Sequence, residues 1–487
     1  MTTGWTELGP VGLVVFEVLR AALRVLLVVL CLHFLRAAWT SFRARDPAAP
    51  APLASLPRVT VQIPVRNEYY VVERVVRAAS ALRYPRELLQ IQVLDDSSDE
   101  TTARASSLCD ELRELGVDIE CLHRDDNVGY KAGALNAALP TATGQFIAMF
   151  DADCVPPADF LERTLPWFGD ATVACVQVRW SFLNREHSVL TRVQALVLDG
   201  LFAVDQFSRA VAGLPLQFNG TNGVWRRSAV DEIGGWNPQI LAEDADLSFR
   251  AYLLGHRVQH VRDYAVPTEI PTDMAAFRAQ QRRWALGSAQ MLRALSLPIL
   301  RSKLPARAKL MMFMHLGRHG IDPLILLACL SSPFTTLFDM PFLVDYSVAS
   351  NLMLIGFVGL ATTVFYARAL DQVRAPMRHV VLVPLIVLVA IGLSLVYTVA
   401  FVRGLLQRGG PFVRTPKAGD ERPGAGPRYR APMDGLAVAE LLIAAAHAAF
   451  AWLAAQAGYV AYAAFFAVVC ASFSWVGLSS LWARWRA

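Results

Sequence analysis

Charged residues are distributed very unevenly along this chain of 487 residues, and this distribution most strongly limits how the chain can fold. From about Arg58 to Lys309 the density of charge is that of a soluble enzyme, whereas long stretches on either side are almost uncharged. Only 18% of all residues are charged, against about 25% in typical soluble domains. The pattern predicts an enzyme-like domain between membrane segments, and it excludes a wholly soluble, disordered or fibrous protein.

The uncharged flanks contain segments long enough to cross a bilayer, which takes about 20 apolar residues in a helix. The first segment, at 11–39, has no Lys or Arg before it, whereas Arg36, Arg43 and Arg45 lie at or beyond its far end. The positive-inside tendency therefore places the N-terminus outside and the following domain in the cytosol. Further segments are expected near 320–341, 346–367 and 380–402, and as a pair within 441–482.

The segment 380–402 produces a conflict in the predicted topology. Basic residues precede it, and others between Arg403 and Lys417 follow it, so both loops suit the cytosol although a single crossing would separate them. Either one loop departs from the positive-inside tendency, or the segment re-enters or lies at the interface. Pro384 and Gly392 would permit a bend, and we favour re-entry.

The central block alternates between strand-like and helix-like segments. We expect strands at 59–65, 89–94, 117–122 and 146–150, with helices at 70–82 and 99–115. Strands separated by helix-length segments predict a mostly parallel sheet. Ligands of such sheets bind beyond the carboxyl ends of the strands, where two acidic pairs fall, Asp95-Asp96 and Asp151/Asp153.

The net charge and the cysteines exclude two further classes of protein. A formal net charge of +5 is spread through the chain without a basic domain, so it reflects membrane topology and argues against a nucleic-acid partner. Seven scattered cysteines without a C-x-x-C pair favour reduced thiols in a cytosolic domain over a disulfide framework.

Two acidic motifs follow predicted strands. Asp151-Ala152-Asp153 can hold Mg²⁺ or Mn²⁺, and the metal would neutralise charge on a departing nucleoside diphosphate; the alternative is a solvated turn. In Asp95-Asp96-Ser97-Ser98-Asp99, Ser98 or Asp99 suits the N-cap of a helix. Capping leaves the Asp95-Asp96 pair free, and an aspartate here can accept the ring N–H of uracil or guanine.

The remaining motifs each allow a structural and a functional interpretation. Glu243-Asp244 is either a helix cap or the source of a base that deprotonates an acceptor hydroxyl. Gln280-Gln281-Arg282-Arg283-Trp284 is either an interfacial helix or a site in which Arg283 binds diphosphate and Trp284 stacks on a sugar ring. Glycines allow close backbone approach in 129–133, which contains Lys131, and in 219–223.

Seven motifs in this order resemble the inverting family-2 glycosyltransferases with a GT-A fold, and within them the cellulose-synthase superfamily, particularly its glucan and mannan synthases. The resemblance spans about residues 58–300, and 412–417 is similar to that superfamily's gating-loop motif. The motifs are D-D-S-S-D, G-Y-K-A-G-A-L-N, D-A-D, Q-V-R-W, F-N-G-T-N-G, E-D-A-D-L and Q-Q-R-R-W.

The resemblance implies a donor site made by residues that follow the strands. Asp96, together with Asp95, would bind the base of the nucleotide, and Lys131 would lie on its phosphate side. Asp151 and Asp153 would hold the metal, Mg²⁺ or Mn²⁺, and with it the diphosphate.

The resemblance also implies the catalytic and acceptor residues. Asp244 would be the base, in the position of the family's T-E-D aspartate, although this chain has A-E-D and so lacks the threonine hydroxyl. Gln280, Arg283 and Trp284 would form the Q-x-x-R-W site beneath a membrane channel, with Arg283 on the donor and the other two on the acceptor. Asn219-Gly220 is assigned to the acceptor side.

We therefore expect an α/β GT-A domain, Rossmann-like with a mostly parallel sheet, in the cytosol below an α-helical transmembrane bundle of the cell membrane. The expected activity is transfer of hexose from UDP-glucose or GDP-mannose to a growing β-linked polysaccharide, with export. The alternatives are a glycolipid synthase that transfers one sugar to a lipid acceptor, and an inactive transferase-like scaffold or transporter. The expected divisions are 1–45 (transmembrane helix), 46–57 (linker), 58–300 (catalytic domain), 301–403 (interfacial and transmembrane helices), 404–434 (cytosolic gating-like loop) and 435–487 (two transmembrane helices).

Overall fold

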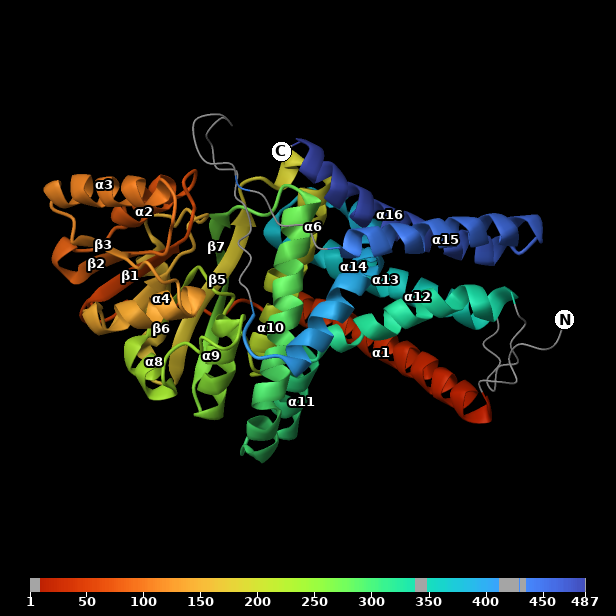
Figure 1. Cartoon of the computed structure of the whole chain (residues 1–487). Coiled ribbons are helices and arrows are strands. Elements are labelled where there is room, and N and C mark those ends of the chain that lie inside the picture. Colours follow the sequence, from red (N-terminus) through yellow and green to blue (C-terminus); the bar gives the residue numbers. More distant parts are fainter. Residues whose placement is uncertain (1–8, 338–347, 411–428, 430–434, 487) are drawn as a thin grey trace.

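The computed structural model describes residues 9–337, 348–410, 429 and 435–486. An N-terminal helix, α1 (Gly9–Arg43), leads into an α/β domain, and the chain then continues through long helices that extend away from the sheet (Figure 1). The gating-like motif expected at 412–417 lies outside the described residues.

The α/β domain is built on one seven-stranded sheet in the order β3-β2-β1-β4-β6-β5-β7. Strand β1 pairs in parallel with β2 and β4, β2 with β3, and β5 with β7, whereas β6 is antiparallel to both its neighbours. The predicted mostly parallel sheet is confirmed. The strands are β1 (Val59–Val65), β2 (Leu89–Asp95), β3 (Ile119–His123), β4 (Phe146–Met149), β5 (Val173–Phe182), β6 (Gly223–Arg226) and β7 (Arg257–Thr268).

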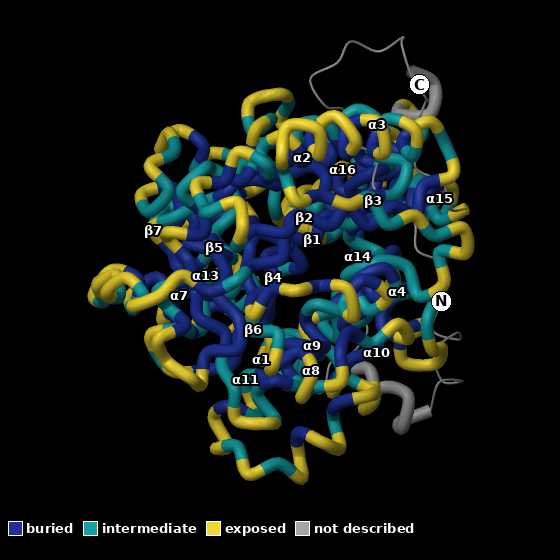
Figure 2. The backbone as a smooth tube through the Cα atoms, turned by 90° about the vertical axis from the view of Figure 1, so that its left-hand side faces the viewer, coloured by how far each residue is buried: buried dark blue, intermediate teal, exposed yellow. Residues whose placement is uncertain are grey.

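Helices cover both faces of the sheet, and the strands between them are mostly buried (Figure 2). One apolar cluster joins the sheet to α2 (Val72–Ser80), α3 (Thr101–Glu114) and α5 (Phe160–Thr164). The cluster on the opposite face joins it to α4 (Tyr130–Ala138), α8 (Arg227–Ile233) and α9 (Glu243–Leu253). Because both faces are covered, polar ligands reach the sheet only along its edges.

A layer of helices lies between the sheet and the apolar helices (Figure 1). It contains α6 (Val189–Asp199), a π-helical turn (Gly200–Gln206), α7 (Phe207–Val211), α10 (Met274–Arg301) and α11 (Ala306–Leu316). The apolar helices are α12 (Asp322–Leu337), α13 (Val348–Val373), α14 (Val383–Leu406), α15 (Leu436–Gln456) and α16 (Val460–Arg486).

Five helical segments of the described chain are long and apolar enough to cross a membrane. They are Glu17–Arg43, Ser350–Val373, Met377–Leu406, Leu436–Gln456 and Val460–Trp482. Polar contacts connect these segments to the rest of the molecule. Arg278 of α10 forms a buried ion pair with Glu440 of α15, and His33 of α1 contacts Asp205 of the π-helical turn in a half-buried hydrogen bond, 2.7 Å between Nε2 and Oδ1. The α/β domain is thus fastened to the apolar helices by specific polar contacts.

The bend on which the re-entrant interpretation of 380–402 rested is not found in the structure. Helix α14 runs without interruption for 24 residues, about 36 Å at 1.5 Å per residue. Pro384 lies in its first turn, where no backbone hydrogen bond is lost. Gly392 allows α14 to pack closely on α16, because a Cβ at this position would collide with the backbone of Ser472. The two residues expected to permit a bend therefore serve to start the helix and to pack it.

Candidate active site

The turn after β4 presents two carboxylates at the carboxyl end of the sheet. The Asp151 N–H donates to Thr221 Oγ1 at 2.8 Å, and the Cys154 N–H donates to the Asp151 carbonyl oxygen at 3.0 Å, which closes the turn. The side chain of Asp151 is 39% exposed, whereas Asp153 is buried. Burial raises the pKa of the Cys154 thiol, which favours a packing role for this cysteine over a reactive one.

Lys131 brings a positive charge to Asp151. Its ammonium group, on the first turn of α4, donates to the Asp151 carboxylate and to the Gly220 carbonyl oxygen, the latter at 2.8 Å. Burial alone would lower the pKa of Lys131, but the negative charges of Asp151, Glu243 and Asp244 outweigh it and raise the pKa above its usual value. The structure therefore brings together four motifs that are spread over more than one hundred residues of the chain, from Lys131 to Asp244.

Glu243 and Asp244 form the first turn of α9 and are half-buried beside this group. Burial and the neighbouring Asp244 raise the pKa of Glu243 to about 7. Burial is also the main cause that raises the pKa of Asp244, to which the charge of Asp151 adds. A carboxylate in this environment holds a proton more tightly than an exposed aspartate, which suits a group that must accept one near neutral pH.

Gly220 allows the loop before β6 to lie against Asp244. Its φ is +83°, and a Cβ at this position would come within 2.9 Å of Asp244 Oδ2. The neighbouring Asn219 is held by two glutamines: its N–H and Nδ2 donate to Gln177 Oε1 at 3.1 and 2.9 Å, and its amide pairs with that of Gln206. The side-chain amide of Asn219 is thus fixed by hydrogen bonds to Gln177 and Gln206.

Sequence reasoning missed the role of these glutamines. Gln177 belongs to the Q-V-R-W motif on β5, so its motif was recognised without its function, whereas Gln206 lies in the π-helical turn, for which the sequence carries no clear signal.

Helix α10 carries the Q-x-x-R-W residues and brings Arg283 near the carboxylates at the carboxyl end of the sheet. Burial lowers the pKa of Arg283, and the carboxylates of Glu243, Asp151, Asp244 and Asp153 act in the opposite direction, so its guanidinium lies in the field of the same acidic group. Trp284 packs against an apolar cluster that includes Phe182 and Phe202, and Gln280 is buried.

The second acidic pair, at the end of β2, is engaged by the end of the neighbouring strand β3. His123 Nδ1 lies 2.7 Å from Asp95 Oδ2, and Arg124 donates to both carboxylate oxygens of Asp96, at 2.8 and 2.6 Å. The hydrogen bond with Asp95 raises the pKa of His123. His123 and Arg124 were not predicted, although the parallel register that sets Asp95 opposite His123 makes them the natural partners.

The residues available for a divalent cation are Asp151 and Asp153. Within the described ranges, no three His, Cys, Asp or Glu side chains gather as a metal site. Mg²⁺ commonly binds proteins through one or two carboxylates while substrate phosphates and water complete its shell, so a pair of aspartates fits such an ion. The bound ammonium of Lys131 shows that the Asp151 carboxylate already attracts a cation.

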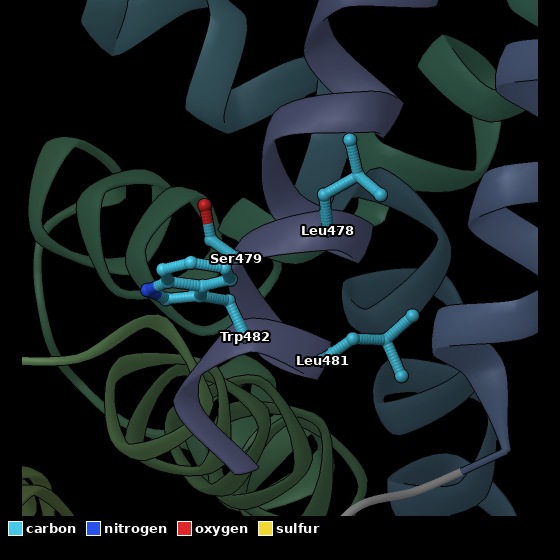
Figure 3. A pocket seen from close by; sticks show the side chains of 4 residues that line it. All are labelled: Leu478, Ser479, Leu481 and Trp482. Atoms are coloured by element: carbon cyan, nitrogen blue, oxygen red, sulfur yellow. The ribbon is translucent and has the colours of Figure 1, made fainter. Parts of the chain in front are cut away.

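The hollow shown in Figure 3 is a separate feature on helix α16. Its lining includes Leu478, Ser479, Leu481 and Trp482, a mainly apolar set without an ionisable group. Its chemistry therefore differs from that of the carboxylate and ammonium group at the edge of the sheet.

Comparisons with known proteins agree with this geometry. Residues 146–402 match the family model of the glycosyl transferase family group 2. Over 254 residues the chain is 40% identical to the probable glucomannan 4-beta-mannosyltransferase 11 of Arabidopsis thaliana, covering 51% of this chain and 57% of that protein. It is 38% identical over 255 residues to the glucomannan 4-beta-mannosyltransferase 1 of Oryza sativa subsp. japonica, covering 51% and 49%. The chain spans about half the length of the curated relatives it matches.

Among solved structures, the mannosyltransferase PcManGT from Pyrobaculum calidifontis, in complex with GDP-Man and Mn²⁺, has a similar fold. The TM-score is 0.58 at 20% sequence identity, and the match covers 80% of this chain and 99% of that one. The GT-A fold expected from the motifs is therefore confirmed, and so is the resemblance to family-2 enzymes. Since the family model covers more than half of its residues, this chain belongs to the glycosyl transferase family group 2.

Proposed function

We propose that this protein transfers mannose from GDP-mannose to a growing β-linked polysaccharide. The observation that carries the proposal is the convergence of Lys131, Asp151, the Glu243-Asp244 pair and Arg283 at one edge of the sheet. The convergence provides cations for a diphosphate and a base for a hydroxyl group. The preference for mannose over glucose rests on the relatives, which are named as glucomannan mannosyltransferases.

In this proposal, the donor binds along the carboxyl ends of the strands. Asp95 and Asp96 bind the base of the nucleotide, beside Arg124, while Lys131 and Arg283 bind the diphosphate. Asp151 and Asp153 would hold Mg²⁺ or Mn²⁺, which when bound neutralises charge that develops on the departing diphosphate.

Asp244 is the proposed base. Its carboxylate removes the proton of an acceptor hydroxyl while that oxygen forms a bond to C1 of the sugar, and the bond from C1 to the diphosphate oxygen breaks in the same step. Such a displacement inverts the anomeric centre, so an α-linked donor gives a β-linked product. The raised pKa of Asp244 makes its carboxylate a stronger base than an exposed aspartate, and the close approach of Gly220 keeps it oriented.

Residues of the middle helical layer are proposed to receive the acceptor. Trp284 offers an aromatic face to a sugar ring and Gln280 a hydrogen-bonding amide, and both lie on α10 near Arg283. The loop containing Asn219 is positioned by Gln177 and Gln206, so Asn219 contributes to the acceptor site by shaping the backbone beside Asp244.

We further propose that the α/β domain, 58–300, lies in the cytosol below helices that span the cell membrane and provide an export path. The linker 46–57 connects it to the first helix, and interfacial and spanning helices follow at 301–403 and 435–487. The support is the five apolar helices and the basic residues beside them.

The test is a donor assay with the full chain reconstituted in lipid. Radiolabelled GDP-mannose and UDP-glucose are offered separately, and the products are divided into polymer and organic-extractable fractions. We expect polymer-bound label from GDP-mannose that a mannanase releases. Label that moves only into the organic fraction supports a glycolipid synthase, and transfer from neither donor supports an inactive scaffold; either result contradicts the proposal.

A further inference from the structure

One face of α10 is covered by α14 over part of its length. At Gly404 of α14 the two helices approach so closely that a Cβ would meet the backbone of Leu286 and lie 2.7 Å from the Ala289 Cβ. One turn beyond Ala289, Arg293 Nη1 donates to the carbonyl oxygen of Leu405, at 3.4 Å. Helix α14 ends one residue later, so the cover ends with it.

The same face of α10 continues beyond the end of α14 without cover. Leu297 and Leu300 follow Arg293 by four and seven residues and therefore lie on its face. Their side chains are 52% and 60% exposed, and Leu310 on α11 is 62% exposed. The opposite side of this hairpin is a packed core, where Leu295 and Ile299 lie against residues of α9 and α11. Leu295 and Ile299 are thus buried against the α/β domain, while the leucines on the outer side remain more than half exposed.

Positive charge surrounds these exposed leucines. The 48 residues from Met274 to Ile321 contain nine Lys and Arg and not one Asp or Glu. Three of these cations, Arg301, Lys303 and Arg307, are exposed at the connection between the two helices. Figure 1 shows this connection as an extension past the ends of the apolar helices, at the level where they meet the middle layer.

We propose that the α10–α11 tip, residues 297–310, binds anionic phospholipids at the membrane surface. Leucines that enter the boundary of the acyl chains, flanked by cations at the level of the headgroups, are the chemistry of an interfacial membrane anchor. Since 274–321 contains no acidic side chain, this segment does not repel the negatively charged headgroups of anionic phospholipids. The tip lies on the side of α10 that already contacts the membrane helix α14, so a bilayer around α14 reaches it.

The test places a fluorophore on the tip of the full chain in lipid nanodiscs. A Leu310→Cys variant is labelled with bimane. The wild-type chain is treated in the same way as a control for background labelling, since its described cysteines are buried or half-buried. Quenching is measured with lipids that carry a spin label near the headgroup, in discs of phosphatidylcholine and in discs that also contain phosphatidylglycerol. We expect quenching that is several-fold stronger in discs with phosphatidylglycerol and that loses this difference at high salt, since each cation near an anionic surface contributes about fivefold to binding.

Two variants show whether the cations of the tip are responsible. Replacing Arg301, Lys303 and Arg307 by Gln should raise the phosphatidylglycerol content needed for half-maximal quenching by at least about tenfold. The matched control replaces Arg83, Arg86 and Arg113, three exposed arginines within the stretch from α2 to the end of α3. Figure 1 shows α2 and α3 at the end of the molecule away from the apolar helices, so this variant should leave quenching unchanged.

Quenching that is independent of phosphatidylglycerol, or equal in both triple variants, overturns the proposal. So does a fluorescence change that requires two copies of the chain in one disc, because it assigns the tip to an interface between protomers. The readout needs no donor turnover, so it separates this proposal from the proposed transferase activity.

Discussion

The two acidic pairs at the edge of the sheet differ in how their charges are neutralised. At the end of β2, Asp95 and Asp96 are both buried and are bound by His123 and Arg124 from the adjacent strand. At the end of β4, Asp151 is partly exposed and its described side-chain partner is the ammonium group of Lys131. The carboxylates of the first pair are thus already engaged by buried or half-buried partners, while the exposed part of Asp151 is open to an added cation.

This difference indicates a division of labour between binding and chemistry. A prearranged network suits recognition of a rigid, neutral group such as a nucleotide base, whose interactions are equal in the ground state and the transition state. Carboxylates that can take up an added cation, beside cations already held in place, suit a site where charge develops during the reaction. Substitutions in the two pairs should therefore affect different kinetic parameters.

The largest effect is expected at the open pair. Asp151→Asn removes a proposed metal ligand and the partner of Lys131, and should lower turnover about 10²–10³-fold or more, with little change in Tm because the side chain is partly exposed. Initial rates and thermal unfolding of the reconstituted protein measure both quantities. Asp125→Asn, at an exposed carboxylate beside His123, is the matched control and should behave like the wild type.

A smaller effect is expected at the completed pair. Asp96→Asn removes a charged hydrogen-bond acceptor from the proposed base site, and should raise the KM for the donor about 10- to 100-fold with kcat nearly unchanged. Steady-state kinetics over a range of donor concentrations provide the measurement. A fall in kcat with unchanged KM would contradict the assignment of this pair to binding.

The third prediction concerns the pH dependence of the open site. Because burial raises the pKa of Asp244, kcat should rise with pH as this carboxylate loses its proton, with a midpoint above the usual value for an aspartate. The charge of Asp244 helps to raise the pKa of Glu243 to about 7, so Glu243 is still neutral while Asp244 loses its proton, and Glu243→Gln should leave this limb in place. A limb that moves clearly to lower pH in Glu243→Gln would show that Glu243 is already charged when Asp244 titrates.

The smallest effect is a contribution to stability at the completed pair. The hydrogen bond with Asp95 raises the pKa of His123 in the folded state, so its stabilisation is fully present below the usual histidine pKa and is lost as pH rises through the folded value. The imidazole is one-third exposed, so the change should stay below about 1 kcal/mol. Thermal unfolding of the wild type and of His123→Gln at pH values on both sides of this transition measures it; an identical shift in both proteins would assign the effect to another group.

The sequence predicted strands β1 to β4 better than the remaining strands of the sheet. Strands β1 to β4 lie within two residues of their expected positions, because each is an apolar run between helices. Strands β5, β6 and β7 were not expected. Strand β6 has only four residues, and it pairs antiparallel with β4 and β5, which lie far from it in the sequence. Tertiary pairing, which no local pattern encodes, completes the sheet.

The site shows the same limit. The two aspartate pairs were visible because each follows an apolar strand, and the position of Asp151 beside Lys131 could be expected from the family resemblance. The partners that fix these motifs were not visible, since Arg124 and Gln206 act only through the folded arrangement of separate elements. The bend expected within 380–402 is not found, because proline and glycine serve helix starts and close packing as readily as bends.

The most direct test of the proposed chemistry compares two aspartates on helix α9. Asp244 faces Gly220 at the proposed site, whereas Asp246, two residues on, is buried and binds Arg250 at 2.7 Å. We predict that Asp244→Asn lowers turnover of GDP-mannose by about 10²–10⁴-fold while Tm and the donor KM stay near the wild-type values. Asp246→Asn should lower Tm while the remaining folded protein keeps its turnover. Full turnover by Asp244→Asn would contradict the central claim that this carboxylate is the base.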